Sequence, residues 1–182
     1  MYNQSFFEAG NDIINLFHES DCNTDVTGDW VKLRDYQRAY VLLIKGGSED
    51  VDDIGLQLLQ GQDATGTGSK ALSAIWRTWY KTGTITSQTA WTAGTAITTI
   101  TDFVCFGSSV PTGATRVIAD VNTNALQLLV EILPEHLDSN GSFDWFTAFI
   151  EGDNVNNSCL VSAYVILQNG KYRGALPLSS IS

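Results

Sequence analysis

The stretch YQRAYVLLI at residues 36–44 and the stretch IGLQLLQ at residues 54–60 decide the fold. The first is rich in β-branched and aromatic residues and ends at a Lys-Gly-Gly sequence and an acidic turn, which is typical of a strand. The second begins with an alternation that places Ile54, Leu56 and Leu58 on the same face. Both stretches therefore predict β-strands, with a turn between them.

Segments of the same type recur along the rest of the chain. Residues 62–70 are small and polar and predict a loop whose glycines supply positive φ angles. Residues 120–133 fit a helical period as well as a strand, and their alternation favours strands. The other predicted strands are residues 71–80, 84–92, 101–106, 116–121, 127–133, 143–151 and 159–167. About ten short strands separated by turns predict an all-β chain, folded as an antiparallel β-sandwich or jelly-roll-like domain.

The segment at residues 143–151 is apolar on both of its predicted faces. Alternation divides its apolar residues into two sets, Phe143, Trp145 and Phe149 on one face and Phe146, Ala148 and Ile150 on the other. One face belongs to the core of the sandwich, and an exposed second face of this size would be an association site. We expect it to be covered by the amino-terminal segment, by a loop or by another chain, which makes homo-oligomerisation a hypothesis.

Residues 1–29 differ from the rest of the chain in charge, because they contain six acidic residues and no Lys or Arg. They also contain two apolar clusters, Phe6-Phe7 and the IINLF sequence at residues 13–17. We interpret this segment as an extended acidic and apolar arm, not as a strand of the core, ahead of a single β-sandwich domain at residues 30–182. The arm either packs across its own domain or docks on a neighbouring subunit.

The composition and charge of the chain exclude several classes of protein. With 182 residues, 43% of them hydrophobic, the chain can bury a core without disulfides or a metal. Its formal net charge of −10 argues against sequence-independent binding to the phosphate backbone of a nucleic acid. A run of about 18 apolar residues is absent from the sequence, so it predicts no membrane-spanning helix. The first residues also lack the pattern of a signal peptide. We therefore expect a soluble protein with no nucleic-acid or membrane partner.

Cysteine and histidine give no indication of a metal centre or a disulfide framework. The chain has an odd number of cysteines, which lie far apart and form no Cys-x-x-Cys pair: Cys22, Cys105 and Cys159. The two histidines, His18 and His136, have no Cys or second His nearby in the sequence. Neither histidine lies near a Gly-x-Ser-x-Gly elbow, which the chain lacks. The sequence predicts no catalytic residue, no metal and no cofactor.

Two further segments resemble ligand-binding motifs only superficially. The sequence GQDATGTGSK at residues 61–70 has Ser before Lys and precedes a strand, whereas a phosphate-binding loop has Lys before Ser or Thr and opens a helix. The acidic turn formed by Glu49, Asp50, Asp52 and Asp53 lacks the spacing of an EF-hand. We interpret the first as a surface hairpin and the second as a solvated turn.

Tryptophan is frequent, with five residues in the chain. Trp76 and Trp79 have opposite parity within one predicted strand, so at most one of them faces the core. The other is covered by a partner or exposed for binding. Aromatic side chains suit sugar rings as well as flat sheets, which leaves a carbohydrate-binding surface open, with Trp79 or Trp91 stacking on the glycan.

The order of these segments resembles a known group of proteins. The segments that carry the likeness are residues 35–44, 56–63, 66–72, 76–80, 89–92, 129–132, 137–138, 143–146, 160–167 and 171–173. Together they resemble small β-rich virion proteins of tailed bacteriophages that are encoded beside the major capsid protein and act as head decoration or cement proteins. The likeness covers residues 30–178 as a pattern of strands and loops, without a single diagnostic motif.

The resemblance implies a structural protein that binds the outer surface of a phage capsid and stabilises it, without catalysis. Its partners would be the major capsid protein and copies of itself, with a trimer favoured, and its location the capsid exterior of the virion. The expected capsid or subunit contacts are Phe6, Phe7, Ile13, Ile14, Leu16, Phe17, Trp79, Tyr172 and Arg173. Two alternatives remain open, a neck, tail or head-fibre component of the virion and a carbohydrate-binding adsorption module.

Overall fold

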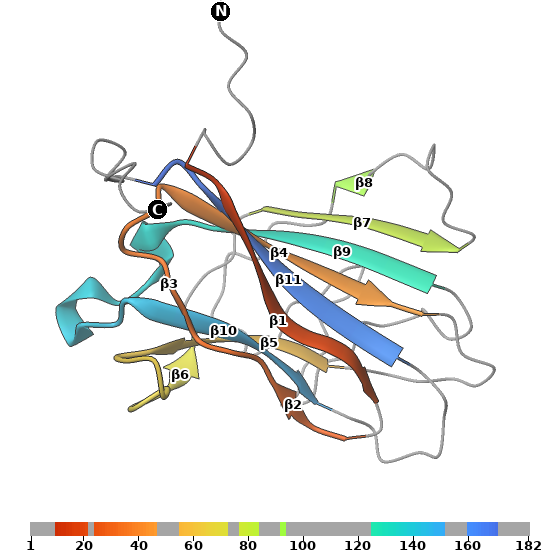
Figure 1. Cartoon of the computed structure of the whole chain (residues 1–182), viewed down its shortest axis with the longest axis horizontal. Helices are drawn as coiled ribbons and strands as arrows, with labels where there is room; N and C mark the ends of the chain where they lie inside the picture. Colours follow the sequence, from red (N-terminus) through yellow and green to blue (C-terminus); the bar gives the residue numbers. More distant parts are fainter. Residues whose placement is uncertain are drawn as a thin grey trace, which may run out of the picture.

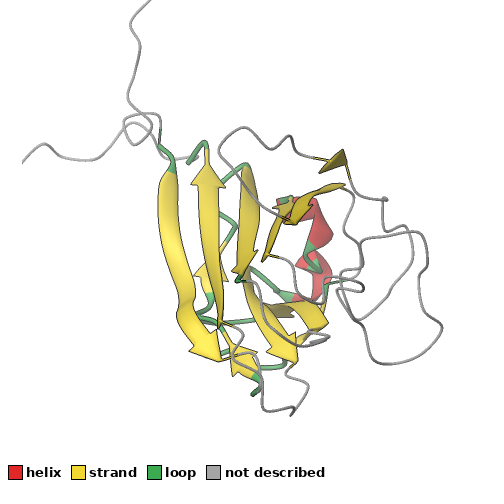
Figure 2. Ribbon diagram, turned by 90° about the vertical axis from the view of Figure 1, so that its right-hand side faces the viewer, coloured by secondary structure: helices red, strands yellow, loops and turns green. Residues whose placement is uncertain are grey.

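The computed structural model describes residues 10–21, 24–46, 55–72, 77–83, 92–93, 125–151 and 160–170, and these residues are mostly β-strand (Figure 1). Two 3-10 turns, η1 (Pro134–His136) and η2 (Ser139–Gly141), lie between β9 and β10 and are the red segments of Figure 2. The strands are β1 (Asp12–Asp21), β2 (Val26–Thr27), β3 (Val31–Lys32), β4 (Arg38–Lys45), β5 (Gly55–Gly61), β6 (Lys70–Ala71), β7 (Arg77–Gly83), β8 (Thr92–Ala93), β9 (Ala125–Ile132), β10 (Trp145–Glu151) and β11 (Leu160–Gln168). In the described part of the chain no helix is long and apolar enough to cross a bilayer.

The strands form two antiparallel sheets with the nested order of a jelly roll. The six-stranded sheet has the order β1-β11-β4-β9-β7-β8, and the five-stranded sheet has the order β2-β10-β5-β6, with β3 also paired to β10. We count β2 and β3 as one interrupted strand and β7 and β8 as an addition between β6 and β9. The eight strands that result pair first with last, second with seventh, third with sixth and fourth with fifth, alternately in the two sheets. This nesting is a jelly roll, so the predicted all-β sandwich is confirmed.

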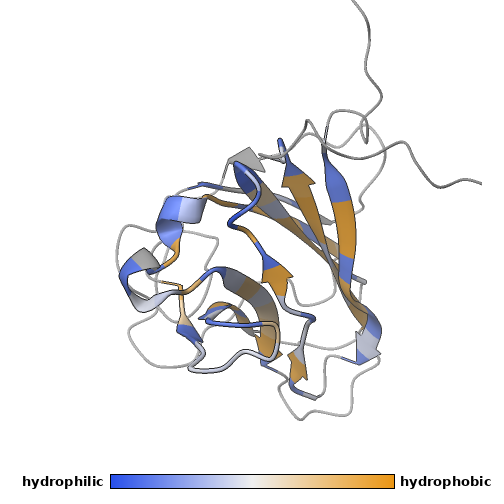
Figure 3. Cartoon of the chain, turned by 60° about the vertical axis from the view of Figure 1, so that its left-hand side comes forward, coloured by the Kyte–Doolittle hydropathy of each residue, from blue (hydrophilic) through white to orange (hydrophobic). Residues whose placement is uncertain are grey.

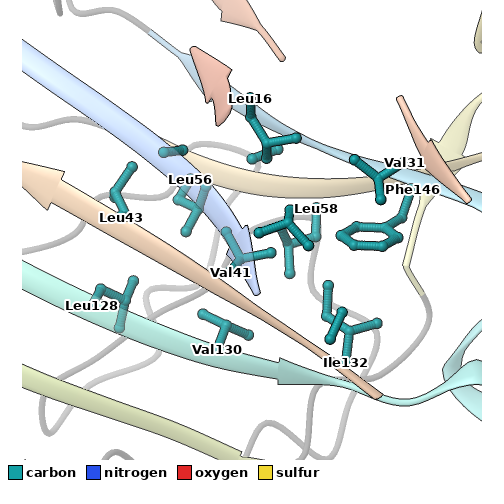
Figure 4. Close-up of a cluster of buried hydrophobic side chains, with 14 of the residues drawn as sticks. Leu16, Val31, Val41, Leu43, Leu56, Leu58, Leu128, Val130, Ile132 and Phe146 are labelled. Carbon is teal, nitrogen blue, oxygen red and sulfur yellow. The ribbon is translucent and has the colours of Figure 1, made fainter. Parts of the chain in front are cut away.

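The core lies between the two sheets and follows from the alternation along each strand. In β4, Ala39, Val41 and Leu43 are fully buried, and the residues between them face outward. Figure 4 shows side chains of β4 and β9 on one side of this core and those of β5 and β10 on the other. Figure 3 shows the corresponding apolar segments along the strands, with hydrophilic residues at the turns. The expectation that residues 120–133 favour a strand is confirmed at β9.

β1, at Asp12–Asp21, is a strand of the six-stranded sheet, which corrects the interpretation of this part of residues 1–29 as an arm and not a strand of the core. β1 pairs along β11, with irregularities between Asn15 and Phe17 and between Phe17 and Ser20. Leu16 and Phe17 are 5% and 8% exposed and belong to the main hydrophobic cluster. The acidic residues of β1 obscured this strand in the sequence, because they occupy exposed positions, whereas Leu16 and Phe17 are in the core and Ile14 packs against it.

The prediction of a single strand at residues 71–80 is wrong, because this stretch contributes residues to both sheets. β6 ends at Ala71 in the five-stranded sheet, and β7 begins at Arg77 in the six-stranded sheet. The backbone N–H of Leu72 still donates to the carbonyl of Leu58 at 2.9 Å, so the chain belongs to the five-stranded sheet up to this residue. Trp76 lies outside the described residues, so the expectation that at most one of Trp76 and Trp79 faces the core stays a prediction. Of the segments 84–92, 101–106 and 116–121, only Thr92 is described, and it begins β8.

The loop predicted at residues 62–70 is confirmed as the connection of the β5–β6 hairpin. Gly66 and Gly68 have φ angles of 75° and 64°, a region that strongly favours glycine. Asp63 Oδ1 accepts hydrogen bonds from the backbone N–H of Thr65 at 2.8 Å and of Thr67 at 3.1 Å. Hydrogen bonds from the Thr67 hydroxyl, the Thr65 hydroxyl and these N–H groups hold the pKa of Asp63 well below its usual range. The hairpin is a defined structural turn.

Candidate interaction surface

The outward side of the six-stranded sheet carries an extensive apolar surface. Pairing registers align its outward side chains in three rows across the strands, in the order β1, β11, β4, β9 and β7. The first row is Ile13, Ile166, Tyr40, Glu131 and Arg77; the second is Asn15, Tyr164, Leu42, Leu129 and Trp79; the third, from β11 onward, is Ser162, Ile44, Gln127 and Lys81. We call these three rows the outer face.

More than half of the outer face is apolar. Its large apolar members are Ile13, Tyr40, Leu42, Ile44, Trp79, Leu129, Tyr164 and Ile166. Ile13 is 49% exposed, and the others are half-buried. Side chains in directly opposed positions of an antiparallel pair lie about 5 Å apart, so these residues form one connected surface. A connected apolar surface rimmed by polar residues is characteristic of an interaction site.

The two aromatic side chains nearest the β7 edge contact each other across the sheet. The ring centroids of Tyr40 and Trp79 are 6.4 Å apart, and the ring planes are inclined by 53°. This tilted arrangement is a favourable geometry for an aromatic pair. The pair gives the apolar surface a fixed aromatic end at the β9–β7 side.

A charged cluster borders these aromatic rings. The Glu131 side chain is only 5% exposed, and its Oε1 atom lies 3.2 Å from Arg38 Nη1 and accepts a hydrogen bond from the Tyr40 hydroxyl at 3.2 Å. Its Oε2 atom lies 3.7 Å from Arg77 Nε. The hydrogen bond to Tyr40 is the main factor that raises the pKa of Arg38. One buried carboxylate therefore orders two arginines at the surface.

A second polar group lies at the β1–β11 side of the face. His18 Nδ1 is 3.5 Å from Ser162 Oγ and 3.3 Å from the Tyr164 hydroxyl, and His18 Nε2 is 3.6 Å from Glu19 Oε1. Ser162 Oγ also accepts a hydrogen bond from the backbone N–H of Glu19 at 2.9 Å. The His18 and Glu19 side chains are 56% and 69% exposed. These long contacts at an exposed site fix the irregular end of β1 and do not have the close, oriented geometry of a catalytic triad.

The structure brings together only some of the contact residues predicted from the sequence. Ile13 and Trp79 lie on the outer face. Ile14 packs against the core, and Leu16 and Phe17 are inside it, so the expected contact with another protein does not extend to Leu16 and Phe17. The other predicted contacts, Phe6, Phe7, Tyr172 and Arg173, lie outside the described residues.

Most of the outer face is not identified by the sequence alone. The sequence predicts a strand for Tyr40, Leu42 and Ile44, and the uninterrupted apolar run at residues 39–44 is the signal that both faces of this strand are apolar. The prediction of two apolar faces for residues 143–151 is confirmed for the strand itself, where Trp145 and Phe149 point away from the core. It is wrong for Phe143, which precedes β10 and is 7% exposed, with Lys70 Nζ 4.3 Å from its ring centroid.

The described residues contain no group of three or more His, Cys, Asp or Glu side chains placed to hold a metal ion. The acidic turn at residues 49–53 and all three cysteines lie outside these residues. His136 is buried in η1, and its Nδ1 accepts a hydrogen bond from the backbone N–H of Leu133 at 3.2 Å. Burial lowers the pKa of His136 below its ordinary value of 6.5. We infer a structural role for this histidine.

The comparisons with known proteins gave no relative. No family model matches the chain, and no curated protein or solved structure matches it significantly.

Proposed function

We propose that this chain is a structural virion protein that binds the outer surface of a tailed-phage capsid and stabilises it as a decoration or cement protein. The observation that carries the proposal is the outer face, an apolar surface that extends across five strands of a rigid sandwich. A protein of this kind needs a stable scaffold and a docking surface. The resemblance in the order of segments supports the same proposal.

The energetics of docking favour a repeated lattice. Complete burial of one large apolar side chain contributes ~1.5–3 kcal/mol before the cost of ordering is subtracted. Side chains that are already half-buried contribute less than this, so a single copy would bind with limited strength. Linked copies of the chain, for which a trimer is the favoured state, would raise the binding strength through avidity. The proposed partners are therefore the major capsid protein and further copies of this chain.

The charge of the chain is compatible with a position on the capsid exterior. A net charge of −10 would oppose binding to packaged DNA, and it is tolerated on the outside of a shell. The proposed location is therefore the exterior of the capsid, and the proposed role requires no cofactor and no catalysis.

The test is to mix the purified chain with phage capsids (heads) that are encoded by the same genome and lack this chain. The copies bound to each capsid are then counted by cryo-electron microscopy. We expect occupancy at symmetric positions over the whole lattice, with the outer face against the shell. Leu42→Asp, which places a charge at the centre of the outer face, should abolish binding. Gln57→Asp is the matched control, because Gln57 lies on the outward side of the five-stranded sheet and the variant adds the same charge.

The alternative functions give different results in the same experiment. Binding at one vertex only would replace the proposal with a neck, tail or head-fibre role. No binding to heads would overturn it, and glycan-array binding that is lost in Trp79→Ala would establish a carbohydrate-binding module instead. A lattice bound equally well by Leu42→Asp and by the native chain would show that the outer face is not the docking surface.

A further inference from the structure

We propose that Arg77 and Arg38 bind a carboxylate on the protein surface to which the outer face docks. Glu131 positions the two arginines beside Tyr40 and Trp79. This inference rests on the proposed function, because it names the chemistry of the partner at that surface. The partner group is an Asp or Glu side chain that lies next to apolar residues.

Glu131 contacts both arginines through its carboxylate. Both of its carboxylate oxygens are engaged, Oε1 by Arg38 and the Tyr40 hydroxyl and Oε2 by Arg77. The Glu131 side chain is 5% exposed, whereas those of Arg38 and Arg77 are 41% and 67% exposed, so the carboxylate is shielded and the two arginines remain accessible. Two positive charges meet one negative charge, which leaves a net positive charge at a fixed position on the surface.

Most of the Arg77 side chain is accessible to a partner. Its contact with Glu131 is through Nε, and 67% of its side chain is exposed, compared with 41% for Arg38. A guanidinium carries five N–H donors in a planar fork, and its two terminal nitrogens match the two oxygens of a carboxylate. Arg77 is therefore oriented through one edge of the fork, and the rest of the group faces the solvent side.

The charge of this cluster is complementary to that of a carboxylate. Among the described residues, the cluster around Glu131 has two basic side chains, Arg38 and Arg77, and one acidic side chain, which gives these three groups a formal charge of +1. The whole chain has a net charge of −10. The acidic residues Glu19 and Asp21 lie on β1, the opposite edge of the sheet. A partner with acidic groups over β9 and β7 would match this surface, whereas a basic partner would be repelled there.

Aromatic side chains surround the two arginines on the outer face. Tyr40 is the neighbour of Glu131 in the pairing of β4 with β9, and Trp79 follows Arg77 on the same face of β7. A carboxylate bound there would lie beside aromatic rings, where the exclusion of water strengthens its attraction to a guanidinium. The site therefore favours a carboxylate attached to an apolar group over a free, fully hydrated anion.

The first test uses benzoate as the probe, because it is the simplest aromatic ring that carries a carboxylate. We expect saturable shifts of the Arg77 Nε–H and Trp79 indole N–H signals when the full chain is titrated by NMR. Benzamide, the neutral analogue, should bind roughly fivefold or more weakly, because it lacks the charge. Arg77→Gln should reduce benzoate binding by the same factor. Arg34→Gln should leave it unchanged, because Arg34 is 69% exposed and pairs with Asp144 away from the outer face.

The second test measures the binding of the same variants to heads that lack the chain, over a range of salt concentrations. Arg77→Gln should weaken binding about tenfold and reduce its dependence on salt, and Arg34→Gln should do neither. Equal binding of benzoate and benzamide, or heads bound equally by Arg77→Gln and the native chain, would overturn the carboxylate site and leave the proposed function intact. Benzoate binding without binding to heads would overturn the proposed function alone. If glucuronate binds more tightly than benzoate, the partner is an acidic glycan and the assignment to a protein surface is wrong.

Discussion

Leu128 and Leu129 are consecutive residues of β9 whose side chains lie on opposite sides of the same sheet. Leu128 is completely buried between the sheets, and Leu129 is half-buried on the outer face, opposite both Leu42 and Trp79. The two residues are both leucines at adjacent positions. Substitutions of Leu128 and Leu129 therefore distinguish effects on the stability of the fold from effects on the binding of a partner.

We expect Leu128→Ala to lower the free energy of unfolding by ~2–5 kcal/mol, because it leaves a cavity in a close-packed core. Leu129→Ala should lower it by less than about 1.5 kcal/mol, because the removed atoms lie at the surface. Urea denaturation of the two variants measures both changes. Equal losses would contradict the assignment of Leu129 to an accessible face.

Gly66 and Gly68 allow a similar comparison in the β5–β6 hairpin. Both have positive φ angles, so an alanine at either position costs about 1–2 kcal/mol in backbone strain. A Cβ at Gly66 would also collide with the indole ring of Trp30, whereas the nearest atom to a Cβ at Gly68 is Gln62 Oε1 at 3.3 Å. We expect Gly66→Ala to lower the melting temperature more than Gly68→Ala in calorimetry. The reverse order would show that Trp30 does not pack on Gly66 in solution.

The ion pair between Arg38 and Glu131 should contribute more to stability than an exposed pair. We expect Glu131→Gln to reduce the free energy of unfolding by roughly 1–3 kcal/mol, because it weakens hydrogen bonds at a shielded position. A double-mutant cycle with Arg38→Gln measures the coupling. The corresponding cycle for the exposed Arg34–Asp144 pair should give less than about 1 kcal/mol. Coupling of equal size in the two pairs would contradict the shielding of Glu131.

The stability of the chain should decrease as the pH falls below 6.5, through the titration of His136. Burial lowers the pKa of this histidine, an effect only partly opposed by the charges of Glu135 and Glu131. The unfolded chain therefore binds a proton at a higher pH than the folded chain, and stability is lost between 6.5 and the lower pKa of the folded state. Urea denaturation at several pH values should show a smaller loss over this range in His136→Gln. The matched control is His18→Gln, and an equal effect of this change would show that the assignment to His136 is wrong.

Several particular features explain how far the sequence predicted the fold and the surface. Alternation correctly identified the strands around residues 36–44, 54–60 and 127–133, because the apolar residues of a strand follow its two-residue period. It failed at residues 71–80, where two apolar segments that belong to different sheets are close in the sequence. It identified Trp79 as a candidate contact but could not place Tyr40, Leu42 or Leu129 beside it, because the registers that join these residues link strands far apart in the chain.

The sequence by itself determined that the chain is an all-β sandwich, because strand periodicity and turn residues are local properties. Only the tertiary structure decided which strand each segment pairs with, and therefore that Leu16 and Phe17 lie in the core while Ile13 lies on the outer face. The same applies to Glu131, whose two arginines come from β4 and β7. Pairing between distant strands depends on the simultaneous burial of both sheets, and the local pattern of one strand does not contain that information.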